Sequence, residues 1–167
     1  VGQRSMEDNT TASNNTAIGW GSLTDNTTGT QNTALGRSAL AANTTADGNT
    51  AVGYLALSAN TTAINNTAVG SQAGDAITTG RYNTLMGYDA GTDMTTGEFN
   101  VGLGGFAIQN ITTVSNLTAV GYAALSENTS GTGNAAFGYY GLFANTTGSY
   151  NTAVGYGSLD ANTTADY

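Results

Sequence analysis

The feature that most constrains this chain is a repeat of seventeen residues that runs along its whole length. A unit reads N-T-A-V-G-Y-x-A-L-x-x-N-T-T-G-x-x, and no insertion or deletion interrupts ten successive copies. After a first, partial copy, the units begin at Asn15, Asn32, Asn49, Asn66, Asn83, Asn100, Leu117, Asn134 and Asn151. Unit positions one to seventeen are counted from these residues. A period this strict indicates that residues at one position stack on each other.

A seventeen-residue unit is too short for the helix pairs of α-solenoids, but it suits one turn of a β-coil. Strand-forming Thr, Val and Tyr alternate with Ala and Gly, and we expect strands at residues 16–20 and their equivalents, with a second short strand near residues 26–28. The predicted fold is therefore all-β: a parallel β-solenoid, or β-roll, of ten coils rising about 4.8 Å each. Residues 1–167 form a single repetitive segment.

Comparison of the copies predicts which positions face inward. Position nine is Leu, Ile or Met except at Gly74 and Gly91, and in those two units position twelve changes from Asn to Ile77 or Met94. This exchange of volume is expected if both positions share one interior, where an unfilled cavity is costly. Position four is always large and apolar, so we expect it in the core as well.

If position twelve is buried, its asparagines must satisfy their amide groups with each other and with the backbone. We therefore predict a ladder of side-chain amides along the solenoid axis. Its members are Asn9, Asn26, Asn43, Asn60, Asn128, Asn145 and Asn162.

The charge and the missing residue types exclude several functions. Three Arg, no Lys and eleven acidic residues give a net charge of −8, which opposes binding to nucleic acid or to an anionic membrane. The sequence contains no His, Cys or Lys, the commonest catalytic bases and nucleophiles, so we expect no enzymatic activity and no cofactor. Its aspartates are scattered over several unit positions, which predicts no metal site.

Aromatic residues recur at position six, directly after the invariant glycine. They are Trp20, Tyr54, Tyr88, Tyr122, Tyr139 and Tyr156. We expect this column to lie at a contact between subunits, where aromatic residues are enriched. The alternative is an exposed stripe that binds glycan. A third hypothesis, an ice-binding solenoid, would need paired threonine rows, but the recurrent threonines at positions thirteen and fourteen are adjacent and face opposite ways.

Three motifs carry a family resemblance: the Asn-Thr-Ala-Val-Gly string, Gly70-Ser71-Gln72-Ala73-Gly74 and Thr78-Thr79-Gly80. They resemble the repeats of bacteriophage tail-fibre proteins, and the first is similar to the head repeats of trimeric autotransporter adhesins, which have a shorter unit. The resemblance implies a homotrimeric segment of an extracellular or virion-surface fibre that supports attachment. Because the chain opens in the middle of a repeat, we expect a fragment of a longer fibre, whose partners are its own copies, end to end or side by side.

Overall fold

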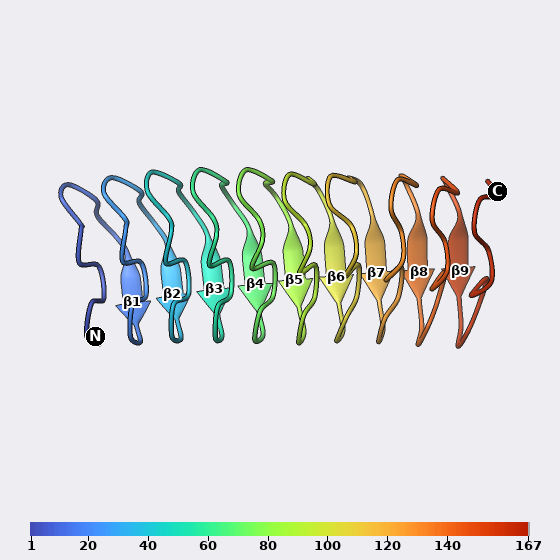
Figure 1. Cartoon of the computed structure of the whole chain (residues 1–167), viewed down its shortest axis with the longest axis horizontal. Coiled ribbons are helices and arrows are strands. Elements are labelled where there is room, and N and C mark those ends of the chain that lie inside the picture. Colours follow the sequence, from blue (N-terminus) through green and yellow to red (C-terminus); the bar gives the residue numbers. More distant parts are fainter. Residues whose placement is uncertain (167) are drawn as a thin grey trace.

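The computed structural model describes residues 1–166 and has the shape of a rod made of stacked coils, with the two termini at opposite ends (Figure 1). Each of nine coils contributes one three-residue strand. The strands are β1 (Thr16–Ile18), β2 (Thr33–Leu35), β3 (Thr50–Val52), β4 (Thr67–Val69), β5 (Thr84–Met86), β6 (Val101–Leu103), β7 (Thr118–Val120), β8 (Ala135–Phe137) and β9 (Thr152–Val154). They form one parallel sheet in sequence order, so the predicted parallel β-solenoid is confirmed.

The register between neighbouring strands equals the repeat length along the whole sheet. Thr16 pairs with Thr33, and Thr33 pairs with Thr50, so like residues lie side by side. Hydrogen bonds between coils continue outside the strands, for example from the Leu23 amide to the Ala39 carbonyl at 3.0 Å. Each coil is therefore bound to the next around much of its circumference, which gives the rod its stiffness.

The second predicted strand, near residues 26–28, is wrong: within residues 1–166 this segment is a bend. The amides of Thr27 and Thr28 both donate to the Thr44 carbonyl, at 2.9 and 3.2 Å. Two successive amides that share one acceptor cannot continue a ladder, because strand amides alternate in direction. The strand at residues 16–20 is also shorter than predicted, since it ends at Ile18.

Position three, and not position four, faces the interior of the coil. Every strand has its middle residue buried and its two outer residues partly or fully exposed. Ala34, Ala51 and Ala68 are fully buried, whereas Leu35 is 43% exposed. The prediction of position four as core was wrong, because successive strand residues point to opposite faces and here the middle residue, at position three, is the one that points inward.

Position five is glycine in every coil because the next coil approaches too closely for a side chain. Gly70 has a φ of 143°, and a Cβ atom there would overlap the carbonyl group of Gly87. Both the conformation and the close approach exclude other residues. This single position sets the spacing between neighbouring coils on that side of the rod.

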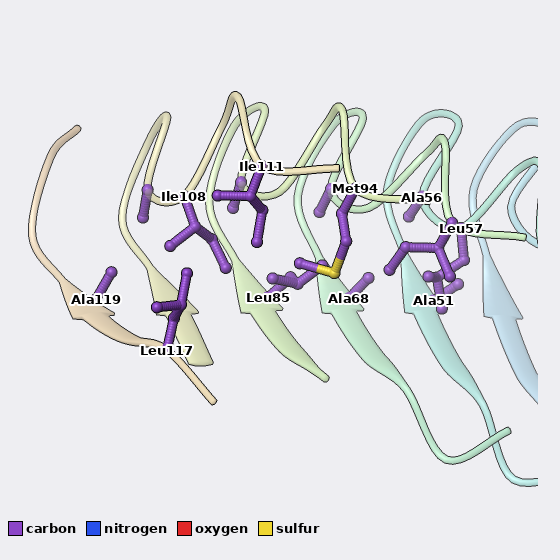
Figure 2. Close-up of a cluster of buried hydrophobic side chains, with 14 of the residues drawn as sticks. Ala51, Ala56, Leu57, Ala68, Leu85, Met94, Ile108, Ile111, Leu117 and Ala119 are labelled. Carbon is purple, nitrogen blue, oxygen red and sulfur yellow. The ribbon is translucent and has the colours of Figure 1, made fainter. Parts of the chain in front are cut away.

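The interior is filled by positions nine and twelve, together with one unexpected strand residue. Leu57, Ile77 and Met94 are fully buried, as the volume exchange predicted. Leu85, in the middle of β5, replaces the alanine usual at position three of the unit and is also fully buried. In Figure 2, Leu85 and Met94 extend toward each other from the strand and from the bend. Leu85 thus occupies part of the space left by the glycines at position nine.

Candidate functional site

The most extensive surface feature is the outer side of the sheet, which we call the strand face. It consists of the side chains at positions two and four of β1 to β9. Position four carries Ile18, Leu35, Val52, Val69, Met86, Leu103, Val120, Phe137 and Val154, and position two is Thr in seven of the nine strands. The nine strands follow one another along the rod (Figure 1). Because the sheet is continuous, the position-four side chains make one apolar stripe.

The stripe is exposed to solvent in the single chain. Ile18, Met86 and Phe137 retain 46%, 44% and 40% of their accessible surface. Isolated apolar side chains are common on protein surfaces, but a contiguous row of nine is not, and such patches mark sites of association. No segment of residues 1–166 covers this face.

Charged residues are absent from the strand face. All three basic and all eleven acidic residues occupy positions six, seven, ten, eleven and sixteen of their units. The net charge of −8 is therefore carried by other parts of the coil. A surface that is rich in aliphatic side chains and free of charge has the composition of the buried centre of a protein interface.

The aromatic column at position six is half-exposed, with Trp20, Tyr54 and Tyr122 between 42% and 45% accessible. Its rings stack on one another along the axis where they are consecutive. Tyr139 lies between Tyr122 and Tyr156, at centroid distances of 5.2 and 5.3 Å and interplanar angles of 13° and 5°. Stacking at this distance covers the ring faces and leaves the edges and hydroxyl groups exposed.

At one of the non-aromatic members of the column, Arg37, a cation takes the place of a ring. Arg37 lies between Trp20 and Tyr54, with its guanidinium carbon 5.3 and 5.7 Å from the two ring centroids. Arg4 contacts Trp20 as well, at 5.9 Å. These cation–π contacts stabilise the stack within one chain. The position-six column therefore stabilises the single chain, a role that was not predicted from the sequence.

The structure places the seven predicted ladder asparagines in two runs inside the coil. Asn43 donates through Nδ2 to Oδ1 of Asn26 at 2.8 Å and accepts from Nδ2 of Asn60 at 3.1 Å. Its Nδ2 also donates to the Ala46 carbonyl at 3.2 Å. A shorter run joins Asn128, Asn145 and Asn162, and Asn26 bonds to Asn9 at 3.3 Å.

A second amide ladder lies at position one, where the replacement of asparagine by Leu117 in one unit indicated a buried column from the sequence. The backbone amide of Asn49 donates to Oδ1 of Asn32 at 2.9 Å, and Nδ2 of Asn32 donates to the Ala46 carbonyl at 2.7 Å. At Leu117 the column loses its amide, but the Leu117 backbone still donates to Oδ1 of Asn100 at 2.9 Å. The near-invariance of asparagine at position one was the available signal.

The threonines at position thirteen also bind the neighbouring coil. The hydroxyl of Thr27 donates to the Thr44 carbonyl at 3.0 Å, and Thr44 repeats the contact to Thr61 at 3.2 Å. These hydroxyls are engaged by backbone and are not free to order water. In seven of the nine strands the outward-facing pair is a threonine and an apolar residue, as in Thr67 and Val69, so the strand face lacks a second threonine row.

One pair of carboxylates is partly buried. Asp75 and Asp89 each have one oxygen with no hydrogen-bond partner in the described chain. Desolvation, and next the charge of Asp89, raise the pKa of Asp75 above its ordinary value. Within residues 1–166 no group of three or more acidic, His or Cys side chains is placed to hold a metal ion.

No family model, curated protein or solved structure matches the chain. The described part of the chain also contains no helix of the length and apolar character needed to cross a membrane.

Proposed function

We propose that the chain is a structural segment of an extracellular or virion-surface fibre, in which three copies associate side by side through their strand faces. The observation that carries this proposal is the uncovered, charge-free row of nine aliphatic and aromatic side chains on the strand face. Burying such a row gains about 25 cal/mol for each Å² of apolar area removed from water.

The distribution of charge supports the same arrangement. Association through the strand face leaves the acidic residues on the remaining surfaces, so that the copies do not bring their net charges of −8 into direct contact. Three copies related by cyclic symmetry can each turn the strand face toward a common axis, and such an assembly is closed. This proposal moves the subunit contact from the position-six column, whose rings already pack within one chain, to the strands.

The fibre acts mechanically in this proposal. Each coil hydrogen-bonds to its neighbours on both sides, and the amide ladders tie the interior together, so that no coil can loosen without breaking contacts to the next. The segment then holds a receptor-binding part of the fibre at a distance from the surface that bears it.

Light scattering combined with negative-stain imaging tests the proposal. The wild-type chain is expected to form thin rods with the mass of three chains. Val69→Glu combined with Val120→Glu places charges on the strand face and should give monomers with an unchanged circular dichroism spectrum.

Thr62→Glu combined with Thr113→Glu is the matched control. It adds the same charge at exposed position fourteen, outside the strands, and should leave association intact. A wild-type chain that stays monomeric at all concentrations, or a strand-face variant that associates like the wild type, contradicts the proposal.

A further inference from the structure

The structure contains a surface depression, which we call the notch, on one side of the coil that contains β7. The fibre proposal does not use it. Along position seven the residues are Phe106, Ala123 and Tyr140 in three successive coils, so a small side chain lies between two large ones. At position ten the middle coil again carries a small residue, Ser126, and the next coil carries the large Phe143. The missing volume in the middle coil leaves a surface depression of about 250 Å³.

Four aromatic rings line this notch, and each is inclined to the next. The Phe106 and Tyr122 centroids are 5.5 Å apart with an interplanar angle of 78°. Tyr122 and Tyr140 are 5.9 Å apart at 59°, and Tyr140 and Phe143 are 4.8 Å apart at 53°. Tyr122 still stacks on Tyr139 within the position-six column, but the rings at positions seven and ten are inclined to Tyr122 and to each other, so the four rings border a common space.

One carboxylate completes the lining. Glu127 borders the notch, and its Oε1 accepts a hydrogen bond from Nδ2 of Asn110 at 2.9 Å. Asn110 is neutral and leaves the charge of Glu127 uncompensated. The ion pairs among residues 1–166 are Arg4 with Glu7 and Arg81 with Glu98, so no guanidinium balances Glu127.

We propose that this notch binds a quaternary ammonium group, such as the trimethylammonium head of a choline-bearing surface molecule. Aromatic faces attract a cation through the ring quadrupole, and recognition of methylated ammonium by several rings is the main functional use of this interaction. Glu127 and the net charge of −8 add attraction for a cation and disfavour an anionic ligand.

The aromatic rings of the notch favour a quaternary over a primary ammonium. A primary ammonium has three donors that must each find an acceptor after losing water, whereas a quaternary group has none. Four of the eight lining residues are aromatic, and Gln109, Ser126 and Glu127 are the polar side chains among the others. The methyl groups of a quaternary ammonium fit such a surface without leaving a buried donor unpaired.

A titration with small ligands, followed through the aromatic NMR signals or by calorimetry, tests the site. Tetramethylammonium and choline are expected to bind saturably, and choline should bind roughly tenfold more tightly than 3,3-dimethylbutan-1-ol, its neutral carbon analogue. Glu127→Gln should weaken choline binding by about the same factor and leave the neutral analogue unaffected.

Ala123→Leu fills the notch and should abolish binding. Leucine already occupies position seven at Leu55, with a φ of 57° against 52° for Ala123, so the variant is expected to fold. Ser38→Leu makes the corresponding change at position seven of another coil, with a φ of 56°, and should leave binding unchanged.

Two results overturn the proposal. The first is equal binding of choline and its neutral analogue, or no saturable binding of either, with a chain whose circular dichroism shows it to be folded. The second is binding of a methyl glycoside without binding of tetramethylammonium, which would make the notch a saccharide site. Neither result bears on the strand face, because the association test is made without these ligands.

Discussion

The Cδ1 atom of Leu85 lies 2.8 Å from the point that a Cβ atom on Gly74 would occupy. A leucine on β5 and a glycine at position nine of the preceding coil therefore share one volume. In most coils the arrangement is reversed, with alanine on the strand and leucine at position nine, as in Ala51 and Leu57. The two residues together keep the interior filled while the backbone stays constant.

This relationship predicts strong coupling between Gly74 and Leu85. Gly74→Leu alone should destabilise the chain by about 1–3 kcal/mol through overpacking, and Leu85→Ala alone by about 2–5 kcal/mol through a cavity. In the double variant the new leucine takes over part of the volume that Leu85 leaves, so it should cost at least about 1 kcal/mol less than the sum. Thermal unfolding of the four proteins measures this coupling; additive effects would show that the two side chains do not share a space.

Two adjacent glycines provide a test of the close approach between coils. Gly104 has a φ of 138°, and a Cβ atom there would overlap the Gly121 carbonyl group, so Gly104→Ala should destabilise the chain by about 3 kcal/mol or more. At Gly105 the nearest atom to a new Cβ, on the Tyr122 ring, is 3.6 Å away. Gly105→Ala should therefore be nearly neutral, and similar melting temperatures for the two variants would contradict the role given to position five.

The amide ladder predicts a large effect at Asn43. Asn43→Ala removes the donor to Asn26 Oδ1 and the acceptor for Asn60 Nδ2, and each stranded buried group costs about 1–3 kcal/mol. Thr45→Ala, at an exposed position two residues away, is the control and should change stability by less than about 0.5 kcal/mol. Chemical unfolding of both variants measures the difference, and equal stabilities would rule out a stabilising ladder.

The partly buried Asp75 predicts a pH-dependent stability. Because desolvation and the charge of Asp89 raise its pKa in the folded chain, the protonated form is favoured on folding. The contribution of Asp75 is therefore fully present below the ordinary pKa of 3.8 and is lost as the pH rises through the folded value.

Asp75→Asn cannot ionise, so it keeps the stability that the wild type loses when Asp75 becomes charged. The variant should therefore melt at a higher temperature than the wild type at pH 7, and the difference should shrink toward pH 3. Asp25→Asn, at an exposed position eleven, serves as the control and should show a smaller difference at pH 7. A difference for Asp75→Asn that does not depend on pH would show that the effect is not one of ionisation.

The repeat predicted the coil, its register and the inward position of Leu40 or Asn43, because these depend on a period and on volume exchange between copies. It failed for position four, where Leu35 was assigned to the core on its size alone. Which side of a three-residue strand faces inward depends on the bends on either side of it. Those bends rely on left-handed conformations at residues such as Leu40, with a φ of 51°, which sequence composition does not reveal.

For the candidate surfaces, too, the sequence predicted which residues recur but not how they are oriented. Trp20 and Tyr54 were visible as a column, but the sequence could not show that Arg37 would fill the space between their rings. The notch around Ala123 depends on a mismatch in size between neighbouring coils, at positions whose direction was unknown from the sequence. Stacking order can be derived from the period, whereas orientation around the coil requires the structure.

Because the register equals seventeen residues, the length of such a rod is proportional to its number of repeat units. Each unit adds about 4.8 Å, and its two ends present the same hydrogen-bonding surface as every other unit. Duplication or loss of a whole unit in the gene would therefore lengthen or shorten the rod in equal steps, provided that coils sharing interior volume, such as those of Gly74 and Leu85, change together.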